Sequence, residues 1–258
     1  TSKTIFDSAG VPKMAKTAQC QTLKGLAKVT KPTRQPPLSR RHKTQRLEWA
    51  RRYMKTDFQN VLFTDECRTT LDGPDGWSSG WLLHGRQPEV RIRRQQGGGG
   101  VMFWAGIKGN SIIGPFKVEL GVKIDSESYC RLLNNYLIPW MEEQPLSLWR
   151  TMIFQHDNAP AHSSKYTTEW LKNAGFNSER VMVWPPNSPD LNPIENLWAI
   201  IKRRVYCNGR QFTNLNDLWN AIKNVSASIT PTEISNLTTS VDQRLVKILR
   251  NKGCHVHA

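Results

Sequence analysis

The chain of 258 residues has no long hydrophobic run. Its uninterrupted apolar stretches are only a few residues long, such as 61–63 and 101–106, whereas a membrane-spanning helix needs roughly 20 residues. No internal repeat is present, which argues against a solenoid, and no signal peptide is recognisable. We therefore expect a soluble protein with one catalytic-sized domain, a small appendage and no association with a membrane.

Cysteine is scarce, and its spacing forms no recognisable motif. The five cysteines are Cys20, Cys67, Cys130, Cys207 and Cys254, and they include no CxxC pair. An odd number of scattered cysteines favours reduced thiols in an intracellular compartment over a disulfide framework. The chain begins at Thr1 rather than at a methionine, and we expect it to be a fragment of a longer protein.

Acidic residues are few, with 21 Asp and Glu against 36 Lys and Arg. Residues 1–60 hold fourteen of the cations and only three acids, so this arm carries +11 of the formal net charge of +15. A concentrated basic excess predicts a polyanionic partner, most often nucleic acid, although a merely soluble basic tail is the alternative. We expect the DNA contacts to come from Lys31, Arg34, Arg40, Arg41 and Lys43.

The basic arm is predicted to hold two parts before the main domain begins. Residues 1–30 include a weakly helical stretch at 11–28, which fits the last helix of a small DNA-binding module. Residues 31–44, KPTRQPPLSRRHKT, are rich in proline and cations and predict an extended linker that follows a phosphate backbone. Helical spacing returns from about Thr44, so we place the main domain at 45–258.

Strand patterns alternate with helix patterns in the main domain. Short apolar runs predict strands at 60–65, 68–71, 89–93, 97–107, 115–120, 151–157 and 180–184. Helical spacing predicts helices at 126–141, capped by Ser126, and at 164–175, and helices dominate the remainder of the chain. This order predicts an α/β fold, in which a mixed sheet is flanked by helices.

Two acids directly follow apolar strand patterns, Asp65 in VLFTDE and Asp157 in MIFQHDN, and Glu195 lies in the opening turn of a predicted helix. Strand ends and helix starts are rigid, and clustered carboxylate oxygens suit Mg²⁺ or Mn²⁺. Two such ions can activate a water or a 3′-hydroxyl and stabilise the departing oxygen of a phosphodiester, which is the chemistry of nucleases and strand transferases. For each acid taken alone, a solvated turn is the alternative.

The segment WPPNSPDLNPIENLW, at 184–198, stiffens the chain just before Glu195. Asn192 suits an N-cap and Pro193 suits the first helical position, so Glu195 falls in a near capping box. Glu195 also lies about 100° of helical rotation from an apolar stripe. The stripe consists of Ile194, Leu197, Trp198, Ile201 and Val205. We expect a carboxylate held at the edge of a buried face, with Asp190 in the preceding turn as the alternative third acid.

Four segments in this order resemble the catalytic domain of mariner-superfamily cut-and-paste DNA transposases, in the Tc-type, D-D-E-bearing branch. The segments are FTDE, GGGGVMFWAGI, QHDNAPAHSS and WPPNSPDLNPIENLW, and the likeness runs from about Gln45 to Arg204. The resemblance implies a ribonuclease-H-like fold in which Asp65, Asp157 and Glu195 hold two Mg²⁺ or Mn²⁺ ions. His162 and Asn158 are expected to support that site.

The same resemblance implies an activity. Such enzymes hydrolyse DNA at transposon ends and join the 3′-hydroxyl ends to TA target sites, and we expect a homodimer on terminal inverted repeats in the nucleus. The region 1–30 would then be the remnant of a helix-turn-helix region. The alternatives are a transposase-derived DNA-binding protein without catalytic activity and a structure-selective nuclease or ribonuclease. The 37 residues between Asp157 and Glu195 slightly exceed the usual gap, and we expect the extra length in the loop at 172–180.

Overall fold

The structure is a computed structural model that describes residues 18, 37–73, 99–118 and 124–256. Contacts divide the chain into two units, Thr1–Pro37 and Leu38–Ala258, and nearly all the described residues belong to the second. Apart from Ala18, the predicted helix-turn-helix remnant lies outside the described residues, as do Lys31 and Arg34. None of the described helices is both long and apolar enough to cross a membrane.

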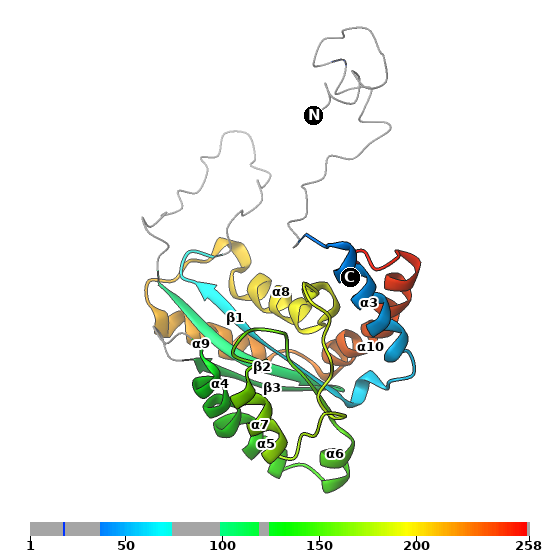
Figure 1. Cartoon of the computed structure of the whole chain (residues 1–258). Helices are drawn as coiled ribbons and strands as arrows, with labels where there is room; N and C mark the ends of the chain where they lie inside the picture. The colour runs from blue at the N-terminus through cyan, green and yellow to red at the C-terminus, as the bar shows by residue number, and fades with distance from the viewer. Residues whose placement is uncertain (1–17, 19–36, 74–98, 119–123, 257–258) are drawn as a thin grey trace. The chain divides into compact units, whose positions relative to one another are not determined.

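A four-stranded sheet in the order β3-β2-β1-β4 organises the second unit. Strand β1 (Val61–Thr70) pairs antiparallel with β2 (Gly100–Lys108), and β2 pairs antiparallel with β3 (Ser111–Val118). On its other side, β1 pairs parallel with β4 (Ile153–Gln155). The sheet is therefore mixed, as the sequence predicts, and helices cover both of its faces (Figure 1).

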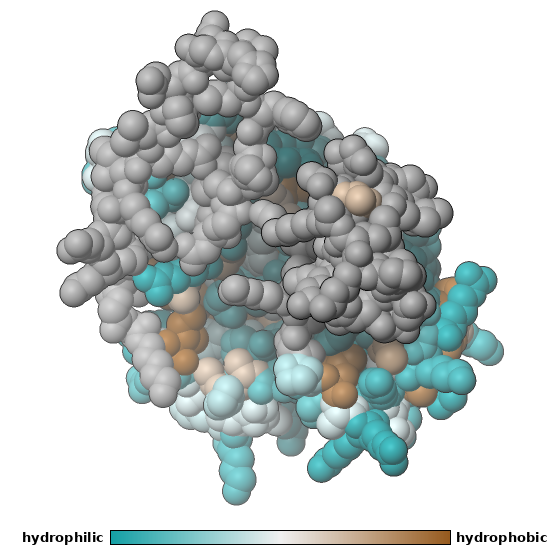
Figure 2. All heavy atoms as spheres, turned by 90° about the horizontal axis from the view of Figure 1, so that it is seen from above, coloured by the Kyte–Doolittle hydropathy of each residue, from teal (hydrophilic) through white to brown (hydrophobic). Residues whose placement is uncertain are grey.

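The helices form two layers. One face of the sheet packs against α3 (Arg40–Arg52), α8 (Ile194–Val205), α9 (Leu215–Ala227) and α10 (Pro231–Arg250). The other face packs against α4 (Ser126–Leu132), a π-helical turn (Leu133–Leu137), α5 (Ile138–Glu142), α6 (Leu146–Thr151) and α7 (Lys165–Asn173). Single 3₁₀ turns lie at Phe58–Asn60, Pro189–Leu191 and Cys207–Gly209. Seen from above, the described surface is mostly hydrophilic, with small separate hydrophobic patches (Figure 2).

The side chains of β1 alternate between the two faces, as the pleat of a strand requires. Phe63 and Cys67 lie in the core beneath α8, α9 and α10, whereas Leu62 lies in the core beneath α4 and α7. By the same alternation, Asp65 faces α8 and Glu66 faces α4 and α7. Asp65 and Glu66, which are neighbours in the sequence, thus lie on opposite faces of the sheet.

Several predicted strand boundaries are wrong. The strands predicted at 60–65 and 68–71 form one continuous strand, β1. The strand predicted at 115–120 begins at Ser111 because Pro115 lies beside a register shift on an edge strand, where its missing N–H costs no ladder bond. The strand predicted at 180–184 is reduced to one parallel bridge, between Val181 and Phe154. The N–H of Val183, on the side away from β4, donates to Tyr53 Oη, 3.0 Å away.

Two predicted helix starts also need correction. The helix predicted from Ser126 is capped by Asp125, whose carboxylate accepts the N–H of Ser128 at 2.9 Å, and a π-helical turn interrupts its continuation. The helix predicted from about Thr44 begins at Arg40 because Ser39 and His42 form a capping box. The last part of the predicted linker, residues 40–44, is therefore helical, and Arg40, Arg41 and Lys43 lie on α3.

A buried ion pair joins segments that are far apart in the sequence. Arg46 of α3 is fully buried and donates to the two carboxylate oxygens of Asp190 at 2.8 and 2.7 Å. Its other contacts reach Ser188 Oγ at 2.7 Å and the carbonyl oxygens of Gly253 and Cys254 at 3.0 and 3.2 Å. This cluster, termed the Arg46 clamp, ties α3, the turn before α8 and the C-terminal segment together.

A second buried arginine and a glycine complete this region. Arg244 of α10 donates to the carbonyl oxygens of Asp190 and Asn192, at 3.0 and 3.3 Å. Gly253 has a φ of +80°, and a Cβ at this position would lie 2.4 Å from the carbonyl oxygen of Lys43. Only glycine therefore lets the C-terminal segment pass close enough to α3 for the Arg46 clamp to form.

Replacing Arg46 with Met tests the clamp, because it leaves the Asp190 carboxylate buried without its cation. We expect the free energy of unfolding at neutral pH to fall by about 3–5 kcal/mol, measured by urea denaturation. Arg131→Met is the control, because the ion pair of Arg131 with Glu127 is exposed; it should change stability by less than about 0.5 kcal/mol. Equal effects of the two changes would show that the clamp does not stabilise the fold.

The pKa of Asp190 determines how the difference in free energy of unfolding between wild type and Arg46→Met depends on pH. Burial alone would raise this pKa, but hydrogen bonds from Arg46 and from the N–H of Val256 lower it below its usual value of 3.8. An acid whose pKa is lower in the folded than in the unfolded state stabilises the fold. This stabilisation is complete at a pH above the unfolded-state pKa, and it is lost as the pH falls through the folded-state pKa. The difference in free energy of unfolding between wild type and Arg46→Met should therefore become smaller below about pH 4.

Candidate active site

Asp65 lies on β1, on the face of the sheet that α8 covers. Its Oδ2 accepts a hydrogen bond from Nε1 of Trp198 on α8, 3.0 Å away. Burial, followed by repulsion from Glu195 and Glu66, raises the pKa of Asp65 to about 7, although the Trp198 bond acts in the opposite direction. The protein thus orients this carboxylate while leaving its charge largely uncompensated.

Asp157 comes level with Asp65 because of the strand register. The parallel ladder pairs Phe63 of β1 with Gln155 of β4, so two residues further along the chain Asp65 and Asp157 lie on neighbouring segments. Asp157 Oδ1 accepts the N–H of Ala159 at 2.9 Å and contacts Nδ1 of His162 at 2.7 Å. No described residue donates a hydrogen bond to Oδ2, so this oxygen is available to a ligand.

Glu195 occupies the first turn of α8, and Asn192 fixes where that turn begins. Asn192 is extended, and its Oδ1 accepts the N–H of Ile194 at 3.2 Å, while Pro193 already has helical backbone angles. The same side chain donates from Nδ2 to the carbonyl oxygen of Thr64 at 3.3 Å, which attaches the helix start to the residue before Asp65. The cap position of α8 is Pro193 rather than the predicted Asn192, although the Asn192 side chain accepts the N–H of Ile194. The Glu195 carboxylate makes no capping bond among the described residues.

The three carboxylates influence one another electrostatically. Partial removal from water and repulsion by Asp157 raise the pKa of Glu195, against the attraction of Lys202 on the same helix. Asp65 is likewise repelled by Glu195. Burial would also raise the pKa of Asp157, but hydrogen bonds from His162 and from the N–H of Ala159 lower it below its usual value. The structure therefore gathers the predicted acids, which lie far apart in the sequence, into one region of negative potential.

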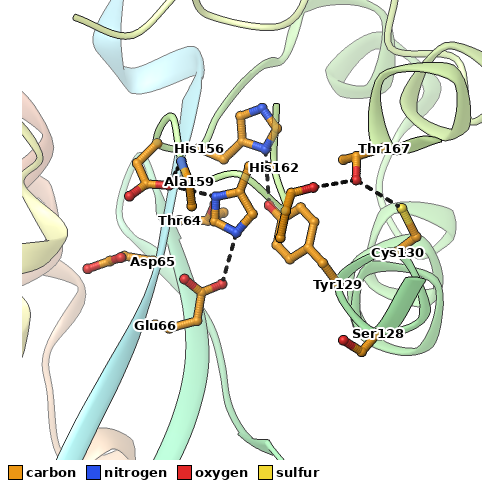
Figure 3. A network of polar contacts seen from close by, with 12 residues as sticks. Thr64, Asp65, Glu66, Ser128, Tyr129, Cys130, His156, Ala159, His162 and Thr167 are labelled. Atoms are coloured by element: carbon orange, nitrogen blue, oxygen red, sulfur yellow. Dashed lines mark hydrogen bonds and ion pairs between the residues drawn. The ribbon is translucent and has the colours of Figure 1, made fainter. Parts of the chain in front are cut away.

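Figure 3 shows a network of aromatic and imidazole rings around His162, and His162 in turn contacts Asp157. The His162 ring lies 3.9 Å from the Tyr129 ring, measured between centroids, and 5.2 Å from the nearly parallel His156 ring. Burial would lower the pKa of His162, yet the bonds with Asp157 and Glu66 raise it to about 9, so the imidazole is positively charged at neutral pH. Burial and the charge on His162 lower the pKa of His156 to about 3.

The other predicted supporting residue lies in the loop after β4. Asn158 donates from Nδ2 to the carbonyl oxygen of Trp184 at 2.9 Å, which connects this loop to the segment before α8. Asp190, the alternative third acid, is committed to Arg46 in a buried pair at 2.7 Å. Using Asp190 as a metal ligand would break the Arg46 clamp, so the structure favours Glu195.

Within the described parts of the chain, no three His, Cys, Asp or Glu side chains form a ready-made metal site. The donor chemistry nevertheless fits a divalent cation. Carboxylate oxygens are the ligands that Mg²⁺ prefers, and Mg²⁺ is commonly held by one or two carboxylates together with waters and substrate phosphates. The pKa of about 7 at Asp65 reflects charge that a bound cation would compensate.

Two contributors to the site were not predicted from the sequence. Trp198 was assigned to the apolar stripe of its helix, and it is indeed buried, but its indole N–H also holds Asp65. Glu66 directly follows Asp65, and the period-2 alternation of a strand places it on the opposite face of the sheet. Buried Trp needs a partner for its N–H, and this requirement is the signal that could have identified Trp198.

A family comparison identifies the domain that carries these acids. Residues 60–219 match the family described as DDE superfamily endonuclease, which is more than half of the chain. The chain belongs to the DDE superfamily endonucleases. The matched region of this DDE endonuclease includes Asp65, Asp157 and Glu195.

The relatives of this DDE endonuclease include transposases. It is 35% identical over 221 residues to the Tc3 transposable-element transposase of Caenorhabditis elegans, covering 84% of this chain and 64% of that protein. It is 30% identical over 229 residues to the Tcb2 transposase of Caenorhabditis briggsae, covering 86% of this chain and 80% of that protein. The chain thus spans just under two thirds of the length of the Tc3 protein.

Solved structures of Mos1 transposase have the same fold as this DDE endonuclease. A pre-cleavage Mos1 transpososome matches with a TM-score of 0.80 at 18% identity, covering 100% of this chain and 75% of that chain. The catalytic domain of Mos1 mariner transposase matches with a TM-score of 0.67 at 17% identity, covering 87% of this chain and 100% of that chain. The expected ribonuclease-H-like fold is confirmed.

The Trp198→Phe substitution removes the N–H that Asp65 accepts but keeps an aromatic ring against Phe103. Because this bond lowers the pKa of Asp65, we expect that pKa to rise further above 7 in the variant. The carboxylate should then bind its proton about tenfold more tightly than in wild type. Carboxyl ¹³C NMR measures it. Trp219→Phe is the matched control, because Trp219 also contacts Phe103; an equal effect in the control would contradict the assignment.

Proposed function

We propose that this DDE endonuclease is the catalytic part of a DNA transposase that cuts transposon ends and joins their 3′-hydroxyl ends to TA target DNA. The observation that carries the proposal is the convergence of Asp65 from β1, Asp157 from the loop after β4 and Glu195 from α8, all within the family's domain. The relatedness to the Tc3 and Tcb2 transposases supports the same conclusion. Neither fold nor sequence favours a DNA-binding protein that has lost its catalytic acids.

The proposal assigns two divalent ions, Mg²⁺ or Mn²⁺, to the three acids. Mos1 paired-end complexes containing Mn and Mg have the same fold, with TM-scores of 0.79 and 0.77. Bound ions of this kind activate a water or a 3′-hydroxyl and stabilise the departing oxygen. The residues of this chain contribute orientation: Trp198 holds one oxygen of Asp65, and His162 holds one oxygen of Asp157. Asn192 fixes the turn from which Glu195 projects.

The proposed partners are DNA at terminal inverted repeats and a second copy of the chain. A second copy is proposed because two transposon ends must be cut and joined, and each end requires an active site. Basic side chains of α3 are suited to DNA phosphates. Arg40 and Arg41 are exposed, and Lys43 is partly buried. Their contact with DNA stays a prediction, as does a location in the nucleus, where transposon DNA would be found.

Alanine substitution of each acid tests the function. Asp65→Ala, Asp157→Ala and Glu195→Ala should each abolish Mg²⁺-dependent cleavage of a labelled terminal-repeat duplex, because each removes a ligand of the metal site. We expect a loss of about 10²-fold or more, with DNA affinity unchanged in a gel-shift assay.

Asp190→Asn provides the matched control. This variant weakens the Arg46 clamp, which holds the turn leading into α8, so its folded fraction should cleave more slowly than wild type but still measurably. Cleavage at the wild-type rate by any of the three alanine variants would contradict the assignment. Complete loss of cleavage in folded Asp190→Asn, as in the alanine variants, would make Asp190 the third acid.

The Arg40→Ala and Arg41→Ala substitutions test the basic face of α3. Each phosphate contact contributes about 0.9 to the slope of log affinity against log salt on duplex DNA. We therefore expect each substitution to make that slope shallower by about 0.9, measured by fluorescence anisotropy between low and moderate salt. Arg131→Ala, which removes an exposed cation from α4 on the other side of the sheet, should leave the slope unchanged. Unchanged slopes in all three variants would remove α3 from the DNA interface.

A further inference from the structure

Glu66 lies beside Asp65 in the sequence but faces the opposite side of the sheet. Its side chain is only 17% exposed, and its Oε1 lies 3.6 Å from Nε2 of His162, an ion-pair distance. Within the described residues, Oε1 has no closer hydrogen-bond donor. His162 is the side chain that faces this oxygen of the partly buried carboxylate.

His162 carries the effect of Glu66 to the site. The imidazole uses Nε2 toward Glu66 and Nδ1 toward Asp157, so it stands between two carboxylates, one from each side (Figure 3). Its side chain is 5% exposed, and the Tyr129 ring covers it at a centroid distance of 3.9 Å. With the ring confined in this way, a proton on Nδ1 is directed at Oδ1 of Asp157.

We infer that Glu66 is a positioning residue for the proposed metal site, acting through His162 to hold Oδ1 of Asp157 and leave Oδ2 for the cation. This inference rests on the proposed function, since it concerns the ligand geometry of that site. Partners of metal ligands commonly matter in this way, because they fix the orientation of the ligand, and their loss lowers metal affinity by about 10–100-fold.

Mn²⁺ titration of the full metal-free chain, followed by electron paramagnetic resonance, tests the inference without relying on activity. Glu66→Leu removes the acceptor at Nε2, so the His162 ring no longer presents a fixed Nδ1 proton, and we expect Mn²⁺ affinity to fall by about 10-fold or more. Glu66→Gln should restore the affinity to within about 3-fold of wild type. The amide of Gln can donate to Nε2, which keeps the proton of a neutral His162 on Nδ1.

A double-mutant cycle tests whether Glu66 affects Mn²⁺ affinity through His162. His162→Gln alone should lower Mn²⁺ affinity at least as much as Glu66→Leu does. Adding Glu66→Leu to His162→Gln should change the affinity by less than about 2-fold, because Glu66 then has no ring to position. Glu127→Leu, which removes an exposed carboxylate from α4, is the control and should have no effect. If Glu66→Leu does not fold, Glu66→Asp replaces it, because the shorter side chain lengthens the 3.6 Å gap.

Two results would overturn the inference. If Glu66→Leu lowers the melting temperature in EDTA but leaves Mn²⁺ affinity unchanged, Glu66 is only a structural residue. If Glu66→Gln loses as much affinity as Glu66→Leu, Glu66 acts through its own charge or as a ligand, not by positioning His162. Failure of the proposed function gives a different pattern, in which wild type binds no Mn²⁺ or in which Asp65→Asn and Asp157→Asn bind it as tightly as wild type does.

Discussion

The ion pair between Arg46 and Asp190 is the constraint on which the position of the candidate active site depends. The pair is almost entirely buried, and because removal of two charges from water makes such a pair expensive to form, its benefit lies mainly in geometry. Asp190 lies in the turn that leads into α8, and Arg244 holds the carbonyl oxygens on either side of Leu191. Asn192 then attaches the first turn of α8 to Thr64 on β1. Through these contacts, Glu195 is fixed relative to Asp65.

The same principle recurs at Asp65 and Asp157, because each carboxylate is held by a side chain from another element. Trp198 of α8 reaches Asp65, and His162 reaches Asp157 from the segment before α7. The Trp198 bond only partly offsets the rise in the pKa of Asp65 that burial and repulsion by its neighbours cause. Rigid supports are needed here, since like charges would otherwise move apart toward water. The proposed metal site depends on these supports to hold Asp65, Asp157 and Glu195 near one another.

The positions of the candidate acids follow from local pattern in the sequence, while their role as metal ligands stays a prediction. Apolar runs ending in Asp65 and Asp157 define strand ends, and the Asn192–Pro193 pair defines a helix start, so short-range chemistry was sufficient. Long-range pairing was not predictable. Arg46 was counted with the DNA-facing charge of the N-terminal arm, yet it is buried against a residue 144 positions away. The predicted strand at 180–184 was wrong in extent, since it pairs with β4 through a single bridge at Val181.

Asp190 and Glu195 show how one short segment assigns opposite roles to two carboxylates. Arg46 and the N–H of Val256 lower the pKa of Asp190, whereas partial burial and Asp157 raise that of Glu195. A metal that recruited Asp190 would have to break a buried pair, at a cost of about 3–5 kcal/mol. A metal that recruits Glu195 would instead relieve repulsion among the acids. Asp190 and Glu195 carry the same carboxylate group. A metal would distinguish them because the fold already pairs Asp190 with a cation, whereas Glu195 lies near other acids.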